Sequence, residues 1–191
     1  MCERCNWSVS SDLMMKYHDT EWGVPLHDDM KLFEFLMLEG FQAGLSWQIV
    51  LNKREAFRKA FDHFNPEIIS MYDEKKILEL LQNKSIIRNR QKIAACVNNA
   101  RRFLNIRKEF GSFDNYIWRF VNYKPIVNSF TEQNQLPAKT PLSDKISADL
   151  KKRGFKFVGS TVVYAHMQAT GMVNDHLTSC FRYHEVNFAD P

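Results

Sequence analysis

The sequence predicts an all-α fold. Apolar residues recur at helical spacing through most of the chain, and the apolar–polar alternation of half-buried strands is nearly absent. Serine and aspartate residues stand where these apolar patterns begin, and glycines follow several of their ends. Such residues cap helix N-termini and stop helices at their C-termini. We therefore expect a set of helices packed around a shared core.

Each helix expected in the first half starts at a residue that favours a helix N-terminus. The starting residues are Asp28 with Asp29, Ser46, Pro66 and Asp73. The apolar residues at helical spacing are Leu32, Phe33, Phe35 and Leu36 in the first helix, and Ile49, Val50, Phe57 and Phe61 in the second. Pro66 begins a short turn, Asp73 caps a helix over 74–82, and a long amphipathic helix over 91–110 stops at Gly111.

Three more helices are expected in the second half. Ser112 restarts the helical pattern over 113–121, and Ser143 caps a helix over 144–152 that stops at Gly154. A last long helix covers 160–170 and stops at Gly171. Between the helices expected over 113–121 and 144–152, the segment 124–141 contains three prolines and many polar residues, so we expect an irregular, mobile connection there.

Composition narrows the class of protein. A chain of 191 residues with 45% hydrophobic residues fits one domain or two closely packed subdomains. Its apolar runs are shorter than the roughly 18 residues of a membrane helix, and the N-terminus lacks the features of a secretory signal. We expect a cytosolic protein without a membrane partner, whose cysteines are thiols or metal ligands. The net charge of +4 permits nucleic-acid binding without requiring it.

Cysteines and histidines at both chain ends form a candidate metal site. Cys5 and His18 lie near the start, and His176 and Cys180 lie near the end with a spacing that places them on one face of a helical turn. Two cysteines and two histidines suit tetrahedral zinc, and four protein ligands indicate a structural ion. Buried thiols and hydrogen-bonded histidines are the alternative. Cys2 forms a Cys-x-x-Cys pair with Cys5, so a site using both cysteines and two later ligands is also open.

The segment 38–47 combines a carboxylate, two glycines and an indole between two expected helices. Glu39 follows an apolar run, so we expect it in a low-dielectric pocket, where a buried carboxylate needs a partner. Gly40 and Gly44 permit close approach of the backbone. The alternative is a solvent-exposed glutamate beside a packing tryptophan.

A series of short motifs covers nearly the whole chain, except 125–141 and about the last ten residues. The motifs are Cys5-Asn6-Trp7, Tyr17-His18-Asp19, Glu21-Trp22-Gly23-Val24-Pro25, Leu38-Glu39-Gly40, Gln42-Ala43-Gly44-Leu45-Ser46-Trp47, Ile86-Ile87-Arg88-Asn89-Arg90, Trp118-Arg119-Phe120-Val121-Asn122, Lys151-Lys152-Arg153-Gly154-Phe155-Lys156-Phe157-Val158-Gly159 and Val173-Asn174-Asp175-His176. In residues and order they resemble the bacterial DNA-3-methyladenine glycosylase I family.

The resemblance implies a helix-hairpin-helix DNA glycosylase fold over 1–191, with two packed helical subdomains. The centre, about 28–121, would carry the hairpin, and a zinc site would join the terminal segments, about 1–27 and 142–191. The resemblance also implies one structural Zn²⁺ per chain, held by Cys5, His18, His176 and Cys180. Cys2 has no counterpart in the family pattern.

The activity implied by the resemblance is hydrolysis of the N-glycosidic bond of 3-methyladenine in alkylated double-stranded DNA. Free 3-methyladenine would be released and an abasic site left, without lyase activity. The flipped base would lie against Trp7, Tyr17 and Trp47, with Glu39 as the base-binding and catalytic carboxylate. Methylation makes the base cationic, so aromatic faces favour it over neutral adenine. Glu39 would accept a hydrogen bond from the exocyclic amino group and offset the charge.

Candidate DNA contacts lie in three segments. The resemblance places a hairpin around 83–92, where backbone amides near Ser85 and the side chains of Arg88, Arg90 and Lys92 would contact phosphates. A solvated basic turn is the alternative. Gly44 and Leu45 are the candidate wedge that replaces the flipped base, although Leu45 could equally belong to the core. A second basic group consists of Lys151, Lys152, Arg153 and Lys156, which could instead complement a helix dipole.

Two other functions compete with this interpretation. A catalytically silent, zinc-stapled nucleic-acid-binding module would have lost the pocket, but Glu39, Tyr17 and Trp47 are all present. A metallohydrolase needs an open ligand position, which four protein ligands do not leave. We therefore expect a monomeric enzyme in the bacterial cytosol, associated with the nucleoid during repair.

Overall fold

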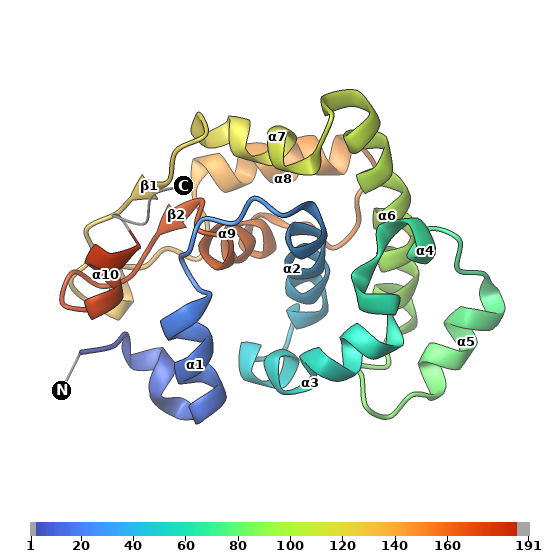
Figure 1. Cartoon of the computed structure of the whole chain (residues 1–191), viewed down its shortest axis with the longest axis horizontal. Coiled ribbons are helices and arrows are strands. Elements are labelled where there is room, and N and C mark those ends of the chain that lie inside the picture. Colours follow the sequence, from blue (N-terminus) through green and yellow to red (C-terminus); the bar gives the residue numbers. More distant parts are fainter. Residues whose placement is uncertain (1–2, 187–191) are drawn as a thin grey trace.

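The computed structural model describes residues 3–186, and Figure 1 shows that this part of the chain is mostly helical. The all-α prediction is confirmed, with one addition. Strands β1 (Ile126–Val127) and β2 (Val173–Asn174) form a parallel pair, with Ile126 opposite Val173 and Val127 opposite Asn174. The pair escapes sequence analysis because each strand is only two residues long and its partner is distant in the sequence.

The helices alternate with short turns along the chain. In order they are η1 (Asn6–Ser10), α1 (Asp12–Thr20), α2 (Asp29–Gln42), α3 (Trp47–Ala60), η2 (Asp62–Phe64), α4 (Pro66–Ile69), α5 (Glu74–Gln82), α6 (Arg90–Phe110), α7 (Phe113–Trp118), η3 (Arg119–Val121), η4 (Gln133–Gln135), α8 (Pro141–Lys152), α9 (Ser160–Ala169) and α10 (Phe181–Glu185). The η elements are 3₁₀ helices. Several of the expected caps are formed: Asp28, Asp73 and Ser112 accept from the backbone amides of Lys31, Lys76 and Asn115.

The structure corrects some expected helix starts. Helix α1 was not predicted, although the Ser11 side chain accepts from Met14 N at 3.2 Å and so caps it. Helix α8 begins at Pro141 with Thr140 as its cap, and Ser143 is its third residue, where it completes a capping box. Proline at the first helical position explains this earlier start, because its fixed φ already suits a helix.

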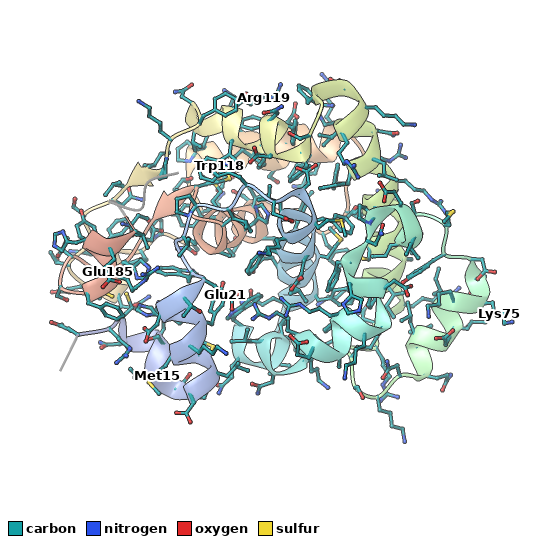
Figure 2. All side chains as sticks on the ribbon, viewed as in Figure 1. Met15, Glu21, Lys75, Trp118, Arg119 and Glu185 are labelled. Carbon is teal, nitrogen blue, oxygen red and sulfur yellow. The ribbon has the colours of Figure 1, made fainter. Side chains whose placement is uncertain are left out.

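A large apolar core surrounds α2. Its members come from helices on all sides, including Phe33 and Phe41 of α2, Phe57 of α3, Phe103 of α6 and Trp118 of α7. In Figure 1, α7 and α8 cover the core at the top and α6 flanks it on the right. Trp118, labelled in Figure 2, is buried, and its Nε1 donates to Leu26 O at 2.9 Å.

Segments from the first and last parts of the described chain lie together at one side of the molecule. Helices α1 and α10 lie together on the left of Figure 1, opposite α5 on the right. A small buried cluster of Cys5, Leu177 and Cys180 joins them. Among residues 3–186, no helix combines the length and apolar character needed to cross a membrane.

The connection 124–141 is held in place at several points. Ile126 N donates to Met172 O at 3.0 Å, and Thr178 N donates to Phe130 O at 2.9 Å. Farther along, η4 forms a single 3₁₀ turn. These bonds fasten the connection to the segment that follows α9.

Candidate base pocket and metal centre

Four buried side chains from the two chain ends converge on one point. Cys5 precedes η1, His18 lies on α1, and His176 and Cys180 follow β2. Their candidate ligand atoms all lie within 4.8 Å of one another. Cys180 Sγ is 3.5 Å from His18 Nε2 and 3.6 Å from His176 Nδ1, and Cys5 Sγ is 3.8 Å from His176 Nδ1. This cluster could hold a metal ion.

The expectation that His176 and Cys180 share a helical turn is wrong. Residues 175–180 form an irregular turn after β2, and Cys180 is the N-cap of α10. The turn is closed by Cys180 N, which donates to Leu177 O at 2.8 Å. Both ligands still face the same point because the turn folds back over Cys5, whose Sγ accepts from Leu177 N at 3.4 Å.

Outer contacts fix both histidine rings. His18 Nδ1 lies 2.8 Å from Asp19 Oδ1, and because a carboxylate only accepts, Nδ1–H is the donor. His176 Nε2 lies 3.0 Å from Trp22 O and donates to it for the same reason. Each ring therefore turns its other nitrogen toward the cysteines, as metal-binding histidines do. A hydrogen bond from Cys5, with others from His176 and His18, lowers the pKa of the Cys180 thiol.

A cavity of about 330 Å³ lies beside the metal cluster. It is within the range of about 300–1,000 Å³ that is usual for small-molecule sites. It is lined by side chains from η1, α1 and the turn after it, α2, α3, α9 and the connection 124–141: Trp7, Met14, Tyr17, Trp22, Glu39, Gln42, Trp47, Gln133, Leu136, Ala165 and Gln168. The structure thus brings Trp7, Tyr17, Trp47 and Glu39 to one cavity.

The aromatic rings of this cavity pack at an angle to one another. The Tyr17 and Trp47 ring centroids are 5.3 Å apart with 44° between planes, and those of Trp7 and Trp22 are 5.0 Å apart at 70°. Trp7 also lies edge-on to His18, with the centroids 5.4 Å apart. The metal cluster therefore touches a wall of the cavity directly.

Glu39 projects from α2 into the cavity. Only 4% of the residue is exposed, and its Oε2 has no hydrogen bond within the part of the chain that the structure describes. Burial raises its pKa from 4.5 to about 8, because desolvation disfavours the charged form. Trp47 Nε1 is likewise buried and lacks an acceptor among the described residues. Among residues 3–186, the cavity thus has an acceptor on Glu39 and a donor on Trp47 that lack hydrogen-bond partners.

Sequence analysis missed several residues that line the cavity. Gln168 of α9 donates through Nε2 to Asp175 Oδ2 at 2.8 Å, and Tyr164 Oη donates to the same oxygen at 2.6 Å. Gln133 and Leu136 come from the connection 124–141. Gln168 could have been found from the sequence, because it lies on the helix expected over 160–170, shortly before His176. No local pattern marks Gln133 or Leu136, because their position depends on the distant strand pair.

The candidate DNA-contact residues of two turns are exposed. Gly44 and Leu45 lie in the turn between α2 and α3, where Leu45 is 39% exposed and Gly44 has a φ of +82°. Ser85 and Arg88 lie in the turn between α5 and α6. Arg90, the first residue of α6, is also exposed and forms an ion pair with Glu74.

Lys92 lies in a different environment from these residues. Its side chain is buried against the end of α2, where Nζ donates to Phe41 O at 2.8 Å and Ala43 O at 2.6 Å. Desolvation lowers its pKa. The ammonium group is therefore occupied by protein carbonyls and does not face DNA phosphates as the sequence suggested.

The second basic group is mixed. Lys151, Lys152 and Lys156 are exposed, whereas Arg153 pairs with Glu109 at 2.7 Å and Asp149 at 2.9 Å. Arg153 also lies over the Phe110 ring, 4.9 Å from its centroid. Its contacts join α8 to the end of α6, so Arg153 is a structural residue.

An ion pair braces the cavity from outside. Arg54 of α3 donates to both carboxylate oxygens of Glu21, at 2.6 and 2.7 Å. Figure 2 shows Glu21 just beyond the end of α1, on the side facing α3. The pair links the helix that carries Tyr17 to the helix that begins with Trp47.

Comparisons with known proteins agree with this site. A family model described as methyladenine glycosylase matches residues 7–183. DNA-3-methyladenine glycosylase 1 of Escherichia coli is 47% identical over 181 residues, which cover 95% of this chain and 97% of that protein. A crystal structure of 3-methyladenine DNA glycosylase I superposes with a TM-score of 0.91 and 48% identity, over 94% of this chain and 98% of that one.

A further solved structure, described as the basis of 3-methyladenine recognition by 3-methyladenine DNA glycosylase I of Staphylococcus aureus, has a TM-score of 0.90 at 35% identity. It covers 93% of this chain and 95% of that one. The family model covers most of the sequence, and the relatives match both its sequence and its fold over nearly their whole lengths. This chain belongs to the methyladenine glycosylase family.

Proposed function

We propose that this protein hydrolyses the N-glycosidic bond of 3-methyladenine in alkylated double-stranded DNA, releasing the free base and leaving an abasic site. One observation carries the proposal: an unpaired, buried carboxylate oxygen of Glu39 in a cavity walled by Trp7, Tyr17 and Trp47. Relatives and solved neighbours that cover nearly the whole chain are named for action on 3-methyladenine.

Glu39 supports selection by charge. In the empty cavity it retains a proton near neutral pH, because burial raises its pKa to about 8. A cationic base favours the ionised carboxylate, since an opposite charge within about 4–6 Å lowers the pKa of an acid. Neutral adenine carries no positive charge, so it does not offset the free-energy cost of ionising Glu39.

The aromatic walls add to this preference. A cation over the face of tyrosine or tryptophan gains about 0.5–2 kcal/mol. Because Tyr17 and Trp47 lie with their centroids only 5.3 Å apart, a bound base contacts more than one ring. The unused Trp47 Nε1 supplies a donor for an acceptor on the base.

The chemical step needs little help from a general base. When the bond between the base nitrogen and C1′ breaks, its electron pair neutralises the positive charge of the base, which leaves without a proton. Water adds its oxygen to C1′ and releases one proton to solvent. The residues of the cavity then need chiefly to bind the base and exclude neutral ones.

The exposed turns supply the proposed DNA contacts. The turn 83–89 leads into the N-terminus of α6, a position that suits a phosphate, with Ser85, Arg88 and Arg90 around it. Leu45 is apolar, exposed and two residues before Trp47, so we assign it to the space left by the flipped base. The Lys92 amine is held by two carbonyls, which supports a monofunctional hydrolase without a lysine nucleophile.

We further propose that the cluster of Cys5, His18, His176 and Cys180 binds one zinc ion. A tetrahedral ion with Zn–S of about 2.3 Å and Zn–N of about 2.0 Å would hold its sulfur and nitrogen ligands about 3.5 Å apart. Three of the four sulfur–nitrogen pairs are 3.5, 3.6 and 3.8 Å apart. When bound, such an ion supplies structural closure, while the cavity side chains act on the base.

DNA, the proposed substrate, is found inside the cell. The described residues of one chain line the cavity. We therefore propose that the protein acts as a monomer in the bacterial cytosol, in contact with the nucleoid during repair. Sedimentation of the purified protein tests the monomer directly, since a dimer would double the apparent mass.

Incubation of the purified protein with methylated DNA, followed by chromatography of the released bases, tests the activity. We expect free 3-methyladenine, and we expect Glu39→Gln to release it more slowly with unchanged metal content. If no 3-methyladenine appears with the protein in excess over DNA, the proposal is overturned. Binding of DNA without release would favour a silent binding module.

A further inference from the structure

Lys92 connects the two turns that we assign to DNA contact. It is the third residue of α6, the helix that begins directly after the turn 83–89. Its backbone amide is held by the N-cap Asn89, at 3.1 Å from Oδ1. Its side chain crosses to α2, where Nζ bonds to Phe41 O and Ala43 O at 2.8 and 2.6 Å. One residue therefore contacts both the start of α6 and the end of α2.

The accepting carbonyls lie where α2 ends. The last carbonyls of a helix lack donors within the helix and carry partial negative charge, so a cation is favoured there. Phe41 is in the last turn of α2, and Ala43 is its C-cap. Lys92 donates to both carbonyls from another helix, whereas such carbonyls usually accept hydrogen bonds from residues next to the helix end.

The turn that Lys92 holds is short, exposed and placed beside the cavity. Within the described part of the chain, one backbone hydrogen bond closes the turn, from Leu45 N to Gln42 O at 2.6 Å. Residues 43–46 are all exposed. Glu39 lies one helical turn before it and Trp47 directly after it, so a shift of the turn moves Leu45 relative to the cavity.

We propose that Lys92 is a positioning residue, which holds the 43–46 turn at a fixed place relative to the 83–89 turn while DNA is bound. Contact of the DNA backbone with the 83–89 turn then determines where Leu45 of the 43–46 turn enters the base stack. This inference rests on the proposed glycosylase function. It differs from that proposal because Lys92 contacts neither the base nor DNA and acts through the turn.

The test compares full-length Lys92→Met with the wild type. Methionine keeps an unbranched, apolar side chain in the buried site and removes the three N–H donors. Lys108→Met is the matched control, because Lys108 is an exposed lysine farther along the same helix. Three quantities are measured: the single-turnover rate of excision from methylated DNA, the affinity for free 3-methyladenine by tryptophan fluorescence, and amide hydrogen exchange of residues 43–46.

We expect Lys92→Met to slow excision by at least about 10-fold, since a misplacement of about 1 Å can cost roughly 100-fold. Affinity for the free base should stay within about twofold of wild type, because the cavity walls do not include Lys92. Exchange at 43–46 should accelerate. An unchanged excision rate would overturn the inference, as would a free-base affinity that falls in proportion to the rate.

A double-mutant cycle with Leu45→Ala tests whether Lys92 affects excision through the position of Leu45. If Lys92 acts by placing Leu45, the double variant is no slower than the slower single variant. Effects that multiply would overturn the inference. If Lys92→Met does not fold, Lys92→Gln, which keeps amide donors without the charge, is measured in the same way. If the wild type itself excises nothing, the proposed function fails, and hydrogen exchange alone decides whether Lys92 orders the turn.

Discussion

At the scale of single residues, Glu39 is a carboxylate that lies buried in the cavity wall. Buried carboxylates usually have hydrogen-bonded partners, because an unsatisfied one costs free energy. The Oε2 atom of Glu39 has none among residues 3–186, and burial alone raises the pKa of the carboxyl group to about 8. The surrounding core of α2 keeps it in place despite this cost.

The stability of the empty protein should therefore depend on the ionisation of Glu39. The folded state retains the proton that the unfolded state loses, so the free energy of unfolding falls as the pH rises from 4.5 to about 8. Glu39→Gln removes this dependence. The free energy of unfolding should be measured by urea denaturation at pH 4.5 and at about pH 8. The difference between Glu39→Gln and the wild type should shift in favour of the variant by several kcal/mol, at most about 5, from the lower to the higher pH.

The exposed Glu79→Gln is the control for this comparison and should not change the pH dependence. Equal pH dependence in wild type and Glu39→Gln would contradict the raised pKa. A gain in stability together with slower excision would identify Glu39 as a residue retained for function.

Gly23 is a second position where one residue decides the local structure. Its φ is +80°, and a Cβ atom there would lie 2.9 Å from His176 Nε2. We expect Gly23→Ala to lower the thermal midpoint and the metal content together, because the added methyl group displaces a ligand ring. Gly44→Ala is the control, since Gly44 has a φ of +82° but no atom within 4 Å of its Cβ position.

Comparing the two alanine variants separates backbone strain, about 1–3 kcal/mol for such a conformation, from displacement of His176. Calorimetry and elemental analysis measure the two effects. If both variants lose the same stability and keep the same metal, the close approach to His176 has no consequence.

At the scale of elements, the connection 124–141 forms part of the cavity as well as joining helices. Strand pairing and the bond from Thr178 to Phe130 fasten it, and η4 then brings Gln133 and Leu136 to the cavity. Leu136 also packs against the cluster of Cys5, Leu177 and Cys180. The same segment therefore contacts both the metal cluster and the cavity.

Leu136→Ala should weaken binding of free 3-methyladenine by about 10-fold, since lost apolar contact in a pocket costs about 1–3 kcal/mol. Fluorescence titration measures the affinity. Leu78→Ala, on the exposed face of α5, is the matched control and should bind normally. Unchanged affinity in Leu136→Ala would show that the connection is not a working wall of the cavity.

Local signals in the sequence predicted most helices well. Capping residues and apolar spacing identify α2, α3, α5 and α9, because these signals act within one or two turns. Helix α1 was missed, although Ser11 followed by Asp12 is a capping signal, since its inward residues are Met14, Tyr17 and His18 and its apolar pattern is weak.

The residues that sequence analysis misplaced depend on distant contacts. Lys92 was grouped with exposed basic residues, yet it shares its inward face with Cys96 and Asn99 on α6, and that spacing could have revealed its burial. Gln133 and Leu136 carry no comparable signal. Their places follow from a strand pair whose partner residues are Ile126 and Val173.

At the scale of the whole molecule, the cluster of Cys5, His18, His176 and Cys180 brings together side chains from the first and last parts of the described chain. We propose that the central helices and these terminal segments act as one unit, because the large core extends from α2 through α6 to α9. The cluster then determines the position of Trp7 and Tyr17 against the part of the cavity that α2 and α3 provide.

Cys180→Ser and His176→Ala should each lose metal and stability together, because a structural ion contributes its binding free energy to folding. Metal analysis combined with thermal unfolding measures both. Cys2 lies outside the described residues, and we expect Cys2→Ser to keep a full equivalent of zinc. Loss of metal in Cys2→Ser would assign that cysteine to the site in place of one of the four ligands.

The distance along the chain between these ligands also determines when the site can form during synthesis. Cys5 Sγ and His176 Nδ1 are 3.8 Å apart, although 171 positions separate their residues. Closing so long a loop costs little more than closing a shorter one, about 0.6 kcal/mol per doubling of length. The timing is nevertheless strict, because Cys5 and His18 leave the ribosome long before His176 and Cys180 are made. Helix α2 and Glu39 can fold early, but the four candidate ligands are all present only after Cys180 has been made, so only chains that reach Cys180 have the complete set.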